Sequence, residues 1–299
     1  MVGWLATLVG IGTIAVALLS GGSAAAPFLL IGGLVVLSFG LTAGAGSQAI
    51  ERRAIGARAY HGPSPLLVFA ASIPISLVAV ILIGLPMTLL GIAVDGPAGR
   101  LASVVAQACV YIGLIRLLVV DTGALTWGAM GVRRPDLSVL GDLAGGALWA
   151  APAILLTIPI AAILSALLPV TPVSPLPPAG ETAGFVVNLL AGAVVAPFGE
   201  EILFRAFATT AWAADLGPRR GLIRGALFFA LAHVLTISGG TAGEALALAV
   251  IGFASRIPVA ILLGWLFLKR RSIWAPIGLH AAFNALLLVL GEATVRSGV

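Results

Sequence analysis

The fold of this chain is decided by residues 184–212, which read GFVVNLLAGAVVAPFGEEILFRAFATTAW. The run is longer than the roughly 20 apolar residues that a helix needs to cross a bilayer. It nevertheless holds two adjacent glutamates and an arginine. Ionisable side chains inside a spanning helix cost about 2.5–3.5 kcal/mol each on insertion scales, so they are functional candidates by default. The stretch therefore predicts a membrane helix that carries a site.

The composition of the whole chain supports a membrane protein. Hydrophobic residues make up 60% and charged residues 9% of the 299 positions, whereas soluble chains carry about 25% charged residues. An ordinary soluble domain, a disordered chain and a nucleic-acid-binding protein are thereby excluded. The single cysteine, Cys109, can form no intrachain disulfide and no cysteine-based metal site.

Apolar runs of spanning length recur along the chain and predict an all-α, polytopic membrane helix bundle. We expect about nine transmembrane helices, near residues 2–20, 27–44, 65–94, 101–120, 142–168, 184–212, 222–238, 244–268 and 273–290. A proline-rich connector over 169–182 separates an N-terminal group of five spans from a C-terminal group of four. This connector predicts two parts, residues 1–180 without a motif and residues 181–299 with the site.

The basic residues concentrate in alternate loops of this arrangement. They are Arg52, Arg53, Arg58, Arg133, Arg134, Arg219, Arg220, Arg224, Lys269, Arg270 and Arg271. The opposite loops and the tail hold only Arg100 and Arg296. Because cytoplasmic loops are enriched in Lys and Arg, we expect a multi-pass protein of the cell membrane with its N-terminus in the cytoplasm and its C-terminus outside.

Ionisable residues of the last four predicted spans lie at similar depths. With about 1.5 Å of rise per residue, Glu200 lies roughly 18 Å, His233 roughly 16 Å and His280 roughly 10 Å from the cytoplasmic ends of their helices. Independent structural residues have no reason to coincide in depth. The sequence therefore predicts one shared cavity that opens to the cytoplasm.

Helical spacing assigns different surroundings to the two glutamates. Glu201 and Arg205 are four residues apart and share a face, so they can form an ion pair. Glu200 is rotated from them by about 100° and is free to act as a base. His280 and Asn284 have the same four-residue spacing and present two hydrogen-bonding side chains on one face of the last helix.

Three motifs in this part resemble those of a known family. Residues 200–205 read EEILFR and match an EExxxR motif, residues 229–233 match FxxxH, and residues 280–284 match HxxxN. Their order and separation are similar to those of the CAAX protease and bacteriocin-processing (CPBP or Abi) family. That family contains intramembrane endopeptidases related to the Ras-converting CAAX endopeptidase.

The resemblance implies a hydrolase that cleaves a peptide or membrane-protein substrate inside the bilayer. Glu200 would activate water with the assistance of His233, and His280 and Asn284 would stabilise the oxyanion. Glu201 and Arg205 would complete the catalytic set as an ion pair that holds Glu200 in place. Side-chain donors of this kind suit a developing oxyanion.

Several alternatives stay open at this stage. Two imidazoles and a carboxylate, His233, His280 and Glu200, could hold Zn²⁺ with one position left for water, although metal-free water activation is equally compatible with the residues. Asn284 could instead join two helices by hydrogen bonding. A proton-coupled transporter or a bacteriocin-immunity scaffold is the rival function, because transporters also bury Glu, His and Arg. Arg256, near the middle of its span, is a candidate counter-charge to the acidic cluster, and it belongs to none of the motifs.

Overall fold

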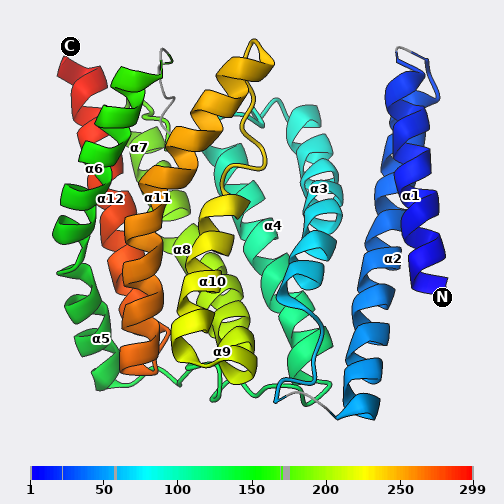
Figure 1. Ribbon diagram of the computed structural model, residues 1–299. Helices are drawn as coiled ribbons and strands as arrows, with labels where there is room; N and C mark the ends of the chain where they lie inside the picture. The colour runs from blue at the N-terminus through cyan, green and yellow to red at the C-terminus, as the bar shows by residue number, and fades with distance from the viewer. Residues whose placement is uncertain (1, 22, 57–58, 169, 171–175, 298–299) are drawn as a thin grey trace. The chain divides into compact units, whose positions relative to one another are not determined.

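The computed structural model describes residues 2–21, 23–56, 59–168, 170 and 176–297. Every regular element within these ranges is a helix (Figure 1), which confirms the all-α bundle. Eight helical segments of the described chain are long and apolar enough to cross a membrane. Three of the predicted connector prolines, Pro169, Pro172 and Pro175, and the basic residue Arg58 lie outside the described residues.

The chain forms two compact units, residues 1–126 and 127–299. The first contains α1 (Val2–Leu19), α2 (Ala26–Ile55), α3 (Pro65–Leu89) and α4 (Pro97–Ile115), and α4 ends in a short π-helix, η1 (Arg116–Val120). Within this unit α1 packs along α2, and α3 packs against both α2 and α4. The division predicted at residues 180 and 181 rested on where the motifs lie, and it stays a prediction about function.

The second unit holds all three motifs. It begins with α5 (Leu137–Ala147) and α6 (Ala150–Leu167), which interrupt the predicted span 142–168 at Leu148 and Trp149. The sixth span is one run made of α7 (Thr182–Leu189), η2 (Leu190–Val195), α8 (Ala196–Glu201), η3 (Ile202–Thr209) and α9 (Thr210–Leu216). Next come α10 (Pro218–Ala232), α11 (Ala242–Arg270) and α12 (Trp274–Ser297).

The seventh predicted span, 222–238, is only partly helical. Its helix α10 has 15 residues and ends at the cap residue His233, so it is too short to cross a bilayer by itself. Beyond it the chain runs through a non-helical segment that contains Ser238, Gly239 and Gly240 before α11 begins. Figure 1 shows this segment carrying the chain to the end of the unit from which α11 returns. Helix and segment together therefore preserve the alternation of the spans.

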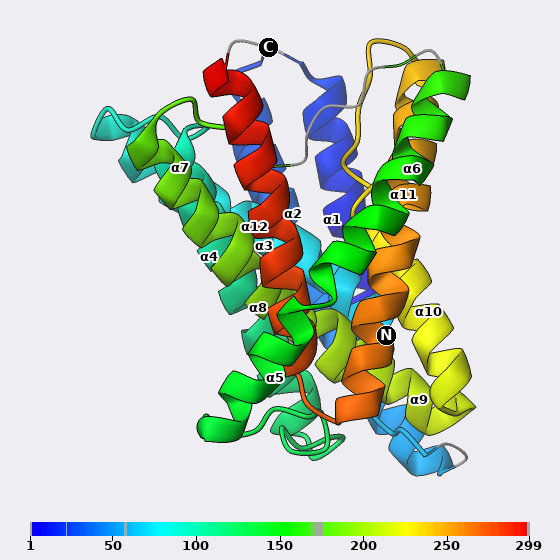
Figure 2. The same cartoon turned by 90° about the vertical axis from the view of Figure 1, so that its left-hand side faces the viewer.

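Two glycines allow α5 and α12 to pack closely within the second unit (Figure 2). A Cβ atom on Gly146 would lie 1.9 Å from the carbonyl oxygen of Ala275, and one on Gly278 would lie 2.1 Å from that of Leu143. Side chains larger than hydrogen would separate the two backbones. The close approach fixes the first turns of α12, which carry His280.

Candidate functional site

The helical run that carries the acidic pair alternates between α- and π-turns. The π-segments η2 and η3 lie on either side of α8, which contains Pro197, Glu200 and Glu201. In η3 the Thr209 hydroxyl donates to the carbonyl of Phe204, five residues earlier, at 2.8 Å. Short π-helical turns inside α-helices occur frequently at functional sites. They change which side chains share a face along this helical run.

Glu201 lies in a closed ion pair. Its Oε1 accepts from Nη1 of Arg205 at 3.0 Å, and the two side chains are 0% and 1% exposed. The same oxygen lies 2.8 Å from Nδ1 of His280. The guanidinium carbon of Arg205 is also 4.1 Å from the ring centroid of Phe229. The predicted pair of Glu201 and Arg205 is thus confirmed, and it anchors His280 as well.

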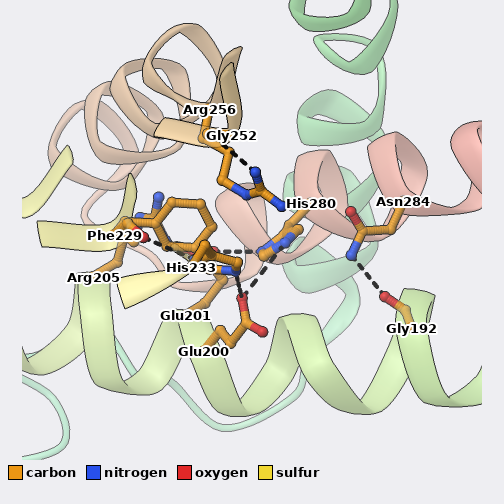
Figure 3. A network of polar contacts seen from close by, with 10 residues as sticks. All are labelled: Gly192, Glu200, Glu201, Arg205, Phe229, His233, Gly252, Arg256, His280 and Asn284. Carbon is orange, nitrogen blue, oxygen red and sulfur yellow. Dashed lines mark hydrogen bonds and ion pairs between the residues drawn. The ribbon is translucent and has the colours of Figure 1, made fainter. Parts of the chain in front are cut away.

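Glu200 faces a different group of side chains, shown in Figure 3. Its Oε2 lies 3.4 Å from Nε2 of His233 and 3.8 Å from Nε2 of His280. The Glu200 side chain is 17% and the His233 side chain 26% exposed, so this part of the site is more open than the pair formed by Glu201. The structure therefore brings together the residues that the depth argument placed at one level.

The hydrogen bonds of the two histidines determine what their rings offer to Glu200. Nδ1 of His233 lies 2.8 Å from the carbonyl oxygen of Phe229, and Nδ1 of His280 contacts the Glu201 carboxylate. Both partners are acceptors, so both Nδ1 atoms carry the proton and donate it. In the neutral tautomer with the proton on Nδ1, Nε2 presents a lone pair beside the Glu200 carboxylate. A water bound there can donate one hydrogen atom to the carboxylate and the other to an imidazole.

Asn284 is not part of this convergence. It lies one turn beyond His280 on α12, and its Nδ2 donates to the carbonyl of Gly192 in η2 at 2.8 Å. The contact joins two helices, as the alternative interpretation of Asn284 from the sequence predicts. Gly192 was not singled out from the sequence, because a backbone carbonyl has no residue-type signal. The approach of His280 to Glu201 was also missed, since similar depth does not decide which glutamate a histidine contacts.

Arg256 is the one further cation near the cluster in the described chain. It lies on α11, where its Nη1 donates to the carbonyl of Gly252 at 2.8 Å, and its charge interacts electrostatically with Glu200. No motif assigns a role to this residue, and from the sequence it was only a candidate counter-charge to the acidic cluster.

Glu200, His233 and His280 are side chains of the types that bind Zn²⁺. Among the described residues, no group of three or more His, Cys, Asp and Glu side chains has an arrangement that could hold one. Glu200 approaches each histidine, but the three side chains do not form a ligand set. Zinc binding by Glu200, His233 and His280 stays a prediction from the sequence.

Comparison with known proteins bears on the same helices. Residues 182–286 match the family model described as "Type II CAAX prenyl endopeptidase Rce1-like". No curated protein and no solved structure matches the chain. The matched segment extends from α7 into α12 and includes all three motifs. The resemblance indicated by those motifs is therefore confirmed, and the segment that carries them is CAAX-protease-like and related to the type II CAAX prenyl endopeptidases.

Proposed function

We propose that the protein is an intramembrane endopeptidase in which Glu200 activates the water that attacks a peptide bond. The main observation in support of this proposal is that the two glutamate side chains differ in their partners and in their exposure. Glu201 is fully buried and neutralised by Arg205 at 3.0 Å, whereas Glu200 is 17% exposed, faces two imidazole nitrogens and forms no ion pair with an arginine or lysine within the described chain. A carboxylate inside a membrane helix without a cationic partner destabilises the fold, and such residues generally mark functional sites.

The proposed reaction uses Glu200 first as a base and then as an acid. A water held between Glu200 and His233 gives a proton to the carboxylate while its oxygen bonds to the carbonyl carbon. The carbonyl oxygen becomes an oxyanion. The carbon–nitrogen bond then breaks, and the proton on Glu200 passes to the departing amine. His233 orients the water through Nε2, because its Nδ1 is held by the carbonyl of Phe229.

The family resemblance assigns oxyanion stabilisation to His280 and Asn284. His280 can donate from Nε2 only as an imidazolium, because its Nδ1 proton is directed to Glu201. Asn284 has one N–H directed to Gly192 and one remaining for the oxyanion. Both roles are part of the proposal and follow from the resemblance.

The site is proposed to open to the cytoplasm. Within the second unit, the first turns of α10 and the last turn of α11 lie at the same end (Figure 2). They carry Arg219, Arg220, Lys269 and Arg270. The enrichment of basic residues in cytoplasmic loops favours this end as the cytoplasmic one. A cleaved bond would then lie in a cytoplasmic or juxtamembrane part of the substrate.

A transporter is the alternative that also explains buried Glu, His and Arg. A transport pathway would distribute these groups between two openings of the protein. The approach of His233 and His280 to one oxygen of Glu200 favours a reaction centre instead. The same approach argues against a scaffold that has lost its active site, since every motif side chain is present.

Activity is tested with detergent-purified protein and a peptide library read by mass spectrometry. We expect the wild type to cleave a subset of the peptides and Glu200→Gln to cleave none, because the amide keeps the volume of the side chain but cannot accept a proton. Both proteins should purify and melt alike. Turnover by Glu200→Gln near the wild-type rate would refute Glu200 as the base, and an inactive wild type would favour the transporter.

Orientation is tested by thiol labelling in cells after Cys109 is replaced by alanine. Arg220→Cys and Ser238→Cys place single thiols at two exposed positions, one at the start of α10 and one between α10 and α11. We expect a membrane-impermeant reagent to label Ser238→Cys in intact cells and Arg220→Cys only in inside-out vesicles. The reverse pattern would invert both the orientation and the proposed side of the substrate.

A further inference from the structure

Arg256 carries a charge in the membrane that the catalytic scheme above does not use. It lies in the middle of α11, which extends over 29 residues and crosses the unit. Its Nη1 donates to the carbonyl of Gly252, four residues earlier in its own helix. No carboxylate in the described chain forms an ion pair with it. Charged side chains inside membrane helices are rare and generally mark function.

The guanidinium group of Arg256 is held beside the site. A Cβ atom on Gly252 would lie 3.1 Å from Nη1 of Arg256 and from Cδ1 of Ile237, and 3.2 Å from Cγ1 of Val234. Val234 follows His233 directly, so the guanidinium lies against the segment that leaves the catalytic histidine. Figure 3 shows the Arg256 side chain reaching from α11 toward His280. Glu200 is the group with which its charge interacts.

The other donors around Glu200 are largely committed. The Arg205 guanidinium is paired with Glu201 through Nη1 and covered by the Phe229 ring, so its Nη2, which has no hydrogen-bond partner, is enclosed with that pair. Nε2 of each neutral histidine is an acceptor, because each Nδ1 carries the proton. Asn284 directs one N–H to Gly192. A guanidinium has five N–H donors, and Arg256 directs one of its nitrogens, Nη1, to the carbonyl of Gly252.

We propose that Arg256 is a catalytic residue that donates a hydrogen bond to the oxyanion formed during peptide hydrolysis. This inference rests on the proposed function and deepens it. It adds a residue from α11 to a set that otherwise comes from the other three helical spans of the motif region.

The movement of charge during the reaction explains why this cation is left without an ion pair. Before attack the negative charge of the open part of the site is on Glu200, in electrostatic range of Arg256. When water adds to the carbonyl carbon, its proton neutralises Glu200 and the negative charge appears on the former carbonyl oxygen. When the carbon–nitrogen bond breaks, Glu200 returns the proton to the amine and becomes negative again. Arg256 forms no ion pair with Glu200 before the attack but donates a hydrogen bond to the oxyanion after it, so it stabilises the intermediate more than the resting state and needs no reorganisation.

The test compares kinetics of Arg256→Gln, Arg256→Lys and a matched control, on the peptide that the wild type cleaves fastest. Lys269→Gln is the control, because Lys269 is an exposed cation on the same helix, 4.4 Å above the Trp265 ring. We expect Arg256→Gln to lower kcat about 10²–10³-fold, the loss typical of one oxyanion donor, with KM little changed. Arg256→Lys should recover part of kcat, and Lys269→Gln should behave as the wild type.

Melting temperatures and the chemistry of the substrate's C-terminus distinguish oxyanion stabilisation from two other roles of Arg256, a structural counter-charge and a binding site for the substrate carboxylate. Arg256→Gln should melt at or above the wild-type temperature, because it removes a half-buried cation that has no ion pair. A lower melting temperature with unchanged kcat would mean a structural counter-charge and overturn the proposal. An effect on KM that disappears when the peptide ends in a carboxamide would mean that Arg256 binds the substrate carboxylate, and would overturn it too. If the wild type cleaves no peptide, the proposed function fails; if it cleaves and Arg256→Gln equals it, only the role of Arg256 fails.

Discussion

Two regions of the site, built around adjacent glutamates, differ in how their charges are compensated. The closed pair, Glu201 with Arg205, is 0% and 1% exposed and is joined at 3.0 Å. The open cluster consists of Glu200, His233 and Arg256. There the carboxylate is 17% exposed, approaches a histidine at 3.4 Å and forms no ion pair with the nearby guanidinium. One region has its charges matched within the protein, whereas the other leaves its polar groups available to water and substrate.

The difference shows how one helix can serve two purposes. Side chains at successive positions point about 100° apart, so Glu201 is directed into the packed interior and Glu200 toward the end of α10. His280 connects the regions, since its two ring nitrogens face one glutamate each. The closed pair thereby fixes a histidine that the open cluster uses.

The largest expected effect comes from breaking the closed pair. Arg205→Leu leaves Glu201 as a buried charge without its cation, a change that typically destabilises a protein by about 3–5 kcal/mol. We therefore expect a markedly lower melting temperature in detergent, measured by the unfolding of purified protein. Activity should fall too, because Glu201 holds Nδ1 of His280 at 2.8 Å.

The double variant Arg205→Leu with Glu201→Leu is the control for this experiment. It removes both charges, and replacement of a buried ion pair by apolar residues is often close to neutral. We expect it to recover part of the lost stability without recovering full activity, since His280 still lacks its partner. Identical melting of the single and double variants would mean that the pair does not stabilise the fold.

The spacing of residues in the sequence was sufficient for the closed pair and for the common depth of the site. Four-residue spacing predicts which side chains share a helical face, and 1.5 Å of rise per residue predicts their depth. Both depend on the helix alone. The ion pair of Glu201 and Arg205 and the approach of His233 and His280 to Glu200 could therefore be anticipated.

Other features depend on neighbours that spacing does not specify. The length of α10 was overestimated because apolar residues continue past His233 although the helix ends there. The π-turns of η2 and η3 and the bond from Asn284 to Gly192 arise from packing between helices. The sequence identifies Arg256 as a cation near the middle of its span, but the direction of its side chain relative to Glu200 can be seen only in the three-dimensional structure.

The smallest expected effect is that of metal removal, which asks whether the open cluster holds an ion as well as water. In the described chain no three side chains form a ligand set, while a water bound to Glu200 and His233 can be activated without a metal. We therefore expect the rate of peptide cleavage to be unchanged after dialysis against a zinc chelator, with the melting temperature measured in parallel. Loss of cleavage on chelation, restored by added Zn²⁺ in the wild type, would instead support the set of Glu200, His233 and His280. In such a set the hydrogen bonds from Nδ1 of both histidines to their acceptors would orient the metal ligands. The closed pair would then be an ion pair, and the open cluster would be a metal centre.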